Sequence, residues 1–175
     1  MSLAHRMRQA ICDTFEQVGA LAPTNCEGWQ AQDLAAHLWI RDRRVDALVA
    51  GLRRPPLPVR LLMSYPNASE YTIHHLDVAR PNGLEVELSE ADERTLLPTT
   101  RMFAKNVAKG FGGRLVVTPS IGGSFAHGTG DRPVHLTGTP SEILYFCAGR
   151  VEHADVEFTG EAETIEALKA SVKGL

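Results

Sequence analysis

Three residues of this 175-residue chain could together bind a metal ion. Glu70 and His74 are four positions apart in a stretch that predicts one short helix, so their side chains stack on the same helical face. His37 falls within a second predicted helix. If the two helices pack side by side, two imidazoles and one carboxylate converge on one point. Three protein ligands and an open position are the coordination of a catalytic zinc site.

The same residues also have an ordinary structural interpretation. A Glu–His pair at this spacing can be a surface contact worth about 0.2–0.5 kcal/mol, and a lone histidine in a helical bundle is more often a hydrogen-bonded core residue. Two acidic residues favour the metal hypothesis, because Asp77 follows His74 by three positions and Asp33 precedes His37 by four. Carboxylates that hold the second ring nitrogen of a ligand histidine are typical of metal sites. We therefore predict that Asp77 orients an imidazole or serves as an acid or base.

Composition and charge narrow the class of protein. Hydrophobic residues make up 43% and charged residues 22%, as in a globular protein with one domain or one domain and a small appendage. The net charge is −3, which gives no electrostatic footprint for nucleic acid. Three cysteines without a CxxC pair argue against a disulfide framework, and no apolar run suits a signal peptide or a membrane span. We expect a cytoplasmic protein without nucleic-acid or membrane partners.

Hydrophobic periodicity predicts helices in the first part of the chain. The first helix, Leu3–Val18, stops at Gly19, and the second runs from about Gln30 to Leu52. Prolines 55, 56 and 58 then predict an extended connector. A third helix should be capped by Asn67 or Ser69 and ended by Pro81-Asn82-Gly83. Ser89 should open a fourth helix, which Pro98 should kink or restart.

A mixed pattern follows from Arg114 onward. Its predicted elements are strands at Leu115–Thr118, Ser124–His127 and Pro133–Thr137, a helix capped by Thr139, a strand at Ala154–Phe158, and a last helix with Ile165, Leu168 and Val172 on one face. The predicted fold is mainly α, with a helical bundle over residues 1–112 and a small α+β unit over residues 113–175.

Three segments resemble the signatures of a known family. Asn25–Leu38 resembles the pattern CxGWxxxDLxxHL, and Glu70–Asp77 resembles ExxxHxxD. Thr137–Arg150 is similar to a C-terminal segment, TGxPxELLxxLxGR. Together they resemble the mycothiol-dependent maleylpyruvate isomerase superfamily, within the wider group of DinB-like metal-binding bundles.

This resemblance implies a DinB-like four-helix bundle followed by a sterol-carrier-like C-terminal unit. It places the family's metal ligands on His37, Glu70 and His74 and the signature aspartate on Asp77. The implied cofactors are a divalent metal, Zn²⁺ ahead of Ni²⁺, and mycothiol, and the implied partners are a small thiol and an electrophilic substrate. In the isomerase the thiol adds to a carbon–carbon double bond, which permits rotation before elimination. Arg150 is a candidate for binding a substrate carboxylate, and its alternative role is a helix C-terminal contact.

One departure from the family pattern leaves the function open. Glu70 follows His37 by only 33 positions, whereas relatives usually have a longer insertion. The bundle would then be open on one side, or covered by a second subunit in a homodimer. Two functions follow: a mycothiol-dependent isomerase or S-transferase, and a non-catalytic module that binds a metal or a small ligand.

Overall fold

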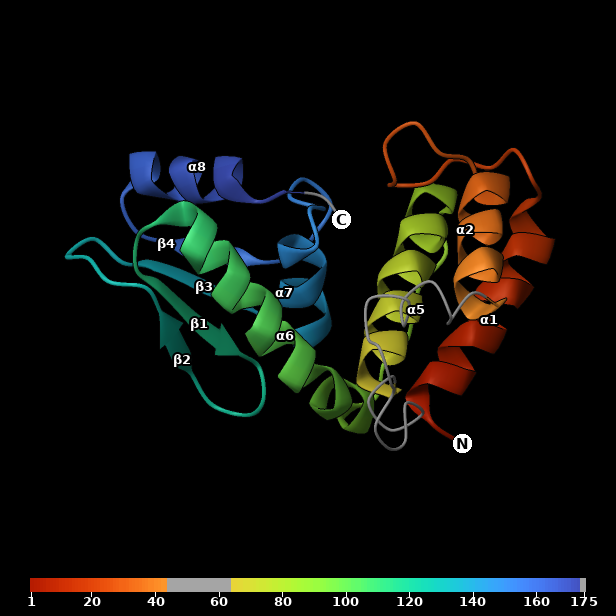
Figure 1. Ribbon diagram of the computed structural model, residues 1–175, viewed down its shortest axis with the longest axis horizontal. Coiled ribbons are helices and arrows are strands. Elements are labelled where there is room, and N and C mark those ends of the chain that lie inside the picture. The colour runs from red at the N-terminus through yellow and green to blue at the C-terminus, as the bar shows by residue number, and fades with distance from the viewer. Residues whose placement is uncertain (44–63, 174–175) are drawn as a thin grey trace, which may run out of the picture. The chain divides into compact units, whose positions relative to one another are not determined.

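The computed structural model describes residues 1–43 and 64–173. By its internal contacts the chain divides into two compact units, Met1–Glu87 and Leu88–Leu175. Figure 1 shows the first unit as helices and the second as a small sheet with helices around it. No described helix is both long and apolar enough to cross a membrane.

The first unit is built around one buried helix. Its elements are α1 (Leu3–Val18), α2 (Ala31–Arg43), α5 (Ser64–Ala79) and the 3-10 turn η1 (Arg80–Asn82). Helix α1 packs against both α5 and α2, and it is amphipathic, with Leu3, Met7 and Ile11 in the core. Every residue of α5 from Ala68 to Ala79 is buried except Glu70, which is half-buried. Ionisable side chains on such a helix require partners.

A loop between α1 and α2 is fixed to the C-terminal part of α5. The backbone N–H of Asn25 donates to the carbonyl of Asp77 (2.9 Å), and the side-chain amide of Asn82 donates to the carbonyl of Pro23 (3.0 Å). Pro23 also forms an isolated β-bridge with Gln30. The CxGW segment therefore lies beside the segment that carries His74 and Asp77.

The second unit has a four-stranded sheet in the order β2-β1-β3-β4. Its elements are α6 (Glu90–Phe111), β1 (Leu115–Pro119), β2 (Phe125–His127), β3 (Val134–Gly138), α7 (Pro140–Cys147), β4 (Glu157–Thr159) and α8 (Ala162–Ser171). The central strands β1 and β3 are parallel, and both edge strands are antiparallel to them. Alternate residues of β1 and β3, such as Leu115 and Leu136, point into a core shared with α6, α7 and α8.

The division into compact units falls between residues 87 and 88. The predicted domains, residues 1–112 and 113–175, stay a prediction. The two divisions differ in α6, whose Ala104, Val107 and Ala108 belong to the same buried cluster as the sheet residues. This helix is also continuous through Pro98, so the proline does not restart it.

Most predicted element boundaries agree with the structure, and the starts of α5 and β4 are the main exceptions. Strand β4 begins at Glu157, three residues after the predicted Ala154. Helix α5 begins at Ser64, before the predicted caps Asn67 and Ser69, and includes Pro66. Proline is tolerated in the first helical turn because the N–H groups there have no intrahelical acceptor. The predicted second half of the helix ending at Leu52 and the connector with prolines 55, 56 and 58 lie outside the described residues.

Candidate metal centre

The three predicted ligands lie together in the first unit. His37 comes from α2, and Glu70 and His74 come from adjacent turns of α5. Nε2 of His37 lies 3.3 Å from Oε1 of Glu70, and Nε2 of His74 lies 3.4 Å from the same oxygen. One ligand atom from each residue lies within 4.8 Å of the other two. The two imidazole rings are 5.3 Å apart and nearly perpendicular.

These separations fit the edges of a coordination tetrahedron. A tetrahedral ion with bonds of about 2.0–2.1 Å has ligand atoms about 3.3–3.4 Å apart, which matches the measured 3.3 Å and 3.4 Å. The donor set of two imidazoles and one carboxylate is also one that zinc accepts. The residues therefore fit a divalent metal in both type and spacing.

The electrostatics of the pair on α5 are strongly coupled. Burial alone would raise the pKa of Glu70, but the hydrogen bond with His74 and the charge of Arg41 lower it to about 2. Burial would lower the pKa of His74, but hydrogen bonds to Asp77, Cys26 and Glu70 raise it to about 10. Without a metal, the site thus holds a carboxylate beside an imidazolium, and a metal ion would displace the imidazolium proton.

Asp77 lies where it can orient the imidazole of His74. Its side chain is fully buried, and Oδ2 is 2.9 Å from Nδ1 of His74. In the neutral ring, a proton held at Nδ1 by this carboxylate leaves Nε2, the nitrogen near Glu70, with a free lone pair.

Arg41 is part of the same cluster, although it was not among the predicted site residues. Its side chain is only 17% exposed, and Nε lies 3.3 Å from Oε1 of Glu70. Nη2 donates to Oδ1 of Asn67 at 3.1 Å. The spacing contained the missing signal, because Arg41 follows His37 by four positions and shares its helical face.

Comparison with known families identifies the family of this chain. The family model described as the mycothiol maleylpyruvate isomerase N-terminal domain matches residues 4–127. The chain belongs to this family. No curated protein and no solved structure matches the chain. The match confirms the resemblance inferred from the signatures, and membership supports a mycothiol-related, DinB-like metal-binding protein. The matched segment contains all three candidate ligands and Asp77.

Cys26 lies within the family match, and its contacts were not predicted from the sequence. Its Sγ is 3.1 Å from Oδ2 of Asp77 and 3.9 Å from Nδ1 of His74. The ring of Trp29, in the same loop, is 5.4 Å from the ring of His37. The Cys26 contacts depend on how the loop folds back onto α5, and the Trp29 contact depends on how the loop lies against α2. Residue spacing carries no information about either arrangement.

Arg150, the other predicted catalytic residue, lies outside the family match and in the second unit. It is buried, and its Nη1 donates to the carbonyl of Ala148, the C-cap residue of α7, at 2.7 Å. This contact corresponds to the helix C-terminal role considered as its alternative. Binding of a substrate carboxylate by Arg150 stays a prediction.

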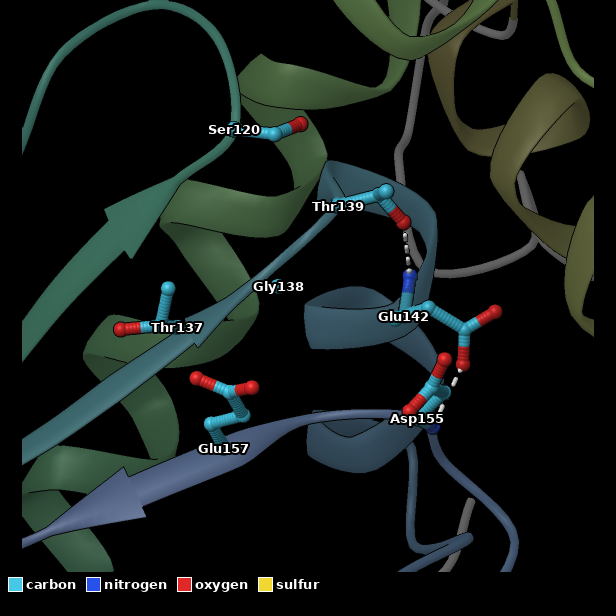
Figure 2. A pocket seen from close by; sticks show the side chains of 7 residues that line it. All are labelled: Ser120, Thr137, Gly138, Thr139, Glu142, Asp155 and Glu157. Atoms are coloured by element: carbon cyan, nitrogen blue, oxygen red, sulfur yellow. Dashed lines mark hydrogen bonds between the residues drawn. The ribbon is translucent and has the colours of Figure 1, made fainter.

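The second unit also contains a cavity of about 320 Å³ that the sequence did not predict. Figure 2 shows it between the ends of β1 and β3, the start of α7 and the beginning of β4. Its lining residues are Ser120, Thr137, Gly138, Thr139, Glu142, Asp155 and Glu157. Oε2 of Glu142 accepts a hydrogen bond from the backbone N–H of Asp155 at 2.8 Å. The cavity shares no residue with the metal-ligand cluster.

Proposed function

We propose that this family member binds one divalent metal ion, Zn²⁺ ahead of Ni²⁺, through His37, Glu70 and His74. The remaining coordination position receives the sulfur of a small cofactor thiol of the mycothiol type. The observation that carries the proposal is the pair of ligand separations, 3.3 Å and 3.4 Å, around Oε1 of Glu70. The thiol is supported by the family, the mycothiol maleylpyruvate isomerase N-terminal domain.

Two of the three candidate ligands are held in place by contacts of their own. His74 is held by Asp77 at Nδ1, and Glu70 is held by Arg41, whose positive charge keeps the carboxylate ionised. Such supporting contacts fix the tautomer and the orientation of the ligand groups. His37 comes from the other helix and closes the cluster. When bound, the metal would lower the pKa of a thiol and supply a thiolate nucleophile.

The three candidate ligands differ in how far their side chains are exposed to solvent. The side chain of His37 is 37% exposed, that of Glu70 is 22% exposed, and that of His74 is 11% exposed. A small molecule therefore reaches the site from the side of His37, where Trp29 also lies. The buried side, with Asp77, serves to orient the ligands.

The proposed reaction is addition of the thiolate to an electrophilic carbon, as in an isomerase or an S-transferase. The four-helix bundle, the sterol-carrier-like C-terminal unit, the cytoplasmic location and the role of Arg150 in substrate binding are further parts of this proposal. The family match over residues 4–127 covers α1, α2, α5 and α6 together with β1 and β2, and it supports a helical bundle at the level of the family.

The decisive experiment is metal analysis followed by cobalt substitution. We expect the purified protein to hold one equivalent of metal, and the Co²⁺ form to change its visible spectrum when mycothiol is added. His37→Ala should lose the metal, whereas His5→Ala, an exposed histidine of α1, should not. Metal binding without any response to thiols would indicate the non-catalytic module. If the wild-type protein binds no divalent metal, the proposal is wrong.

A further inference from the structure

Cys26 has a defined place in the first unit that the metal ligands do not explain. Its thiol is partly buried and lies between the loop and α5, 3.1 Å from Oδ2 of Asp77. The same oxygen is 2.9 Å from Nδ1 of His74. A single carboxylate oxygen thus faces two donor groups, a thiol and an imidazole N–H.

The local backbone holds the thiol in this place. Asn25 donates its backbone N–H to the carbonyl of Asp77, and the backbone N–H of Cys26 donates to Oγ1 of Thr24 at 3.2 Å. The backbone N–H of Trp29 donates to the carbonyl of Cys26 at 3.0 Å. The thiol is therefore positioned by backbone bonds on both sides of the residue.

Distances distinguish the two clusters that share His74. Cys26, His74 and Asp77 could also form a ligand set, since one atom from each lies within 4.8 Å of the others. Around Nε2 of His74 the 3.4 Å separation fits a tetrahedral edge, but around Nδ1 the separation from Oδ2 is 2.9 Å. That value is the usual length of an N–H···O hydrogen bond. The first cluster has the spacing of ligands and the second has the spacing of a hydrogen-bond chain.

We propose that Cys26 is a positioning residue for the metal ligand His74, acting through Asp77. Two hydrogen bonds form this connection: the Cys26 S–H donates to Oδ2 of Asp77, and the N–H at Nδ1 of His74 donates to the same oxygen. With two donors the fully buried carboxylate is confined to one orientation, and this in turn confines the imidazole whose Nε2 faces Glu70. The inference rests on the proposed metal function and adds the residue that controls the carboxylate.

The test compares Cys26→Ala, which removes the donor, with Cys26→Ser, which keeps one. Co²⁺ affinity should fall about 3–10-fold in Cys26→Ala, less than the about 10–100-fold typical of a group that contacts the ligand directly. Its visible spectrum should shift, and Cys26→Ser should restore most of both. Cys12→Ala is the matched control, because Cys12 is exposed on α1. In the metal-free protein, the NMR signal of the His74 Nδ1 proton should move in Cys26→Ala and return in Cys26→Ser.

Several outcomes would overturn the inference. Unchanged affinity, spectrum and proton signal in Cys26→Ala would show that the thiol does not position His74. Two Co²⁺ ions per chain, with a sulfur-to-cobalt charge-transfer band that Cys26→Ala removes, would make Cys26 a ligand instead. Failure of the wild-type protein to bind Co²⁺ would refute the proposed metal function, and the proton signal of the metal-free variants would still decide the role of Cys26.

Discussion

The two ring nitrogens of His74 have different partners. Nε2 faces Glu70 and Nδ1 faces Asp77. Loss of the ring and loss of its hydrogen-bond partner should therefore have different effects. We expect His74→Ala to abolish metal binding and Asp77→Asn to weaken it only about 10–100-fold, because an orienting group is not a ligand.

Calorimetric titration with Zn²⁺ measures both variants, and a thiol-transfer assay with mycothiol measures their activity. We expect Asp77→Asn to lose turnover while it keeps most of its metal at saturating Zn²⁺. If Asp77→Asn has full turnover on an identified substrate, Asp77 has no part in the chemistry. If His74→Ala binds Zn²⁺ as tightly as the wild type, the ligand assignment is wrong.

The Glu70–His74 pair predicts a pH dependence for the metal-free protein. The pKa of His74 is raised from 6.5 to about 10, so its contribution to stability is complete below pH 6.5 and is lost as the pH rises toward 10. The pKa of Glu70 is lowered from 4.5 to about 2, so its contribution is complete above pH 4.5 and is lost as the pH falls toward 2. The pair should therefore stabilise the fold most between these limits, from pH 4.5 to 6.5.

Urea unfolding of the metal-free protein, followed by circular dichroism, checks this dependence. The free energy of unfolding should decrease from about pH 6 to about pH 9 in the wild type, as proton linkage requires. In the double variant Glu70→Gln/His74→Gln the decrease should be smaller. Equal slopes in the two proteins would contradict the assigned protonation states.

Residue spacing could pair two of the candidate ligands, but it could not predict what surrounds them. Glu70 and His74 could be paired because helical periodicity is local, and Arg41 could have been added to His37 by the same rule. The contact of Cys26 with Asp77 could not be predicted in this way. It depends on a loop that is held against α5 by backbone bonds between residues far apart in the sequence, such as Asn25 and Asp77.

At the level of single elements, helix α7 begins on a buried side-chain contact. Both oxygens of Glu93 accept hydrogen bonds from Ser141 in the first turn of α7, from the backbone N–H at 2.8 Å and from the hydroxyl at 2.6 Å. Burial raises the pKa of Glu93, and the bonds from Ser141 oppose that rise. The contact connects α6 to α7 at a helix end that would otherwise have an unpaired N–H.

Glu93→Ala should destabilise the second unit by about 1–3 kcal/mol, because it leaves buried donors without an acceptor. The control is Glu90→Ala, which removes an exposed pair with Arg94 and should cost less than about 1 kcal/mol. Hydrogen exchange of the α7 amides measures the effect locally. Equal exchange rates in both variants would show that Glu93 does not hold the helix start.

Element boundaries were predictable where the signal is a cap. Ser89 forms the capping box with Asp92 that opens α6, and Gly112 ends the helix with a left-handed conformation, φ 72°. Thr139 caps α7 as its sequence indicated. Packing was harder to predict: the apolar face of α6 is equally suited to a bundle and to a sheet, and its alanines and valine lie in the core with the strands.

For the molecule as a whole, the division into two units separates their responses to metal. All three candidate ligands belong to Met1–Glu87. Free metal at 100 times its dissociation constant stabilises the state that binds it by about 2.7 kcal/mol. We expect added Zn²⁺ to slow hydrogen exchange in α2 and α5 and to leave the exchange of α7 and β3 unchanged.

Mass-spectrometric exchange with and without Zn²⁺ tests this separation on the full chain. His37→Ala serves as the control, since its exchange should not respond to the metal. Equal protection of both units would show that they unfold as one cooperative body.

The contact between Trp29 and His37 gives the protein an optical property of its own. The chain has two tryptophans, and Trp29 lies against a candidate ligand whereas Trp39 is 58% exposed on the same helix as that ligand. A paramagnetic ion such as Co²⁺ at His37 would quench the emission of the nearer indole more strongly, so Trp29→Phe should remove most of the quenching and Trp39→Phe should preserve it. The intrinsic tryptophan fluorescence of the unlabelled protein would therefore decrease as the metal site is filled.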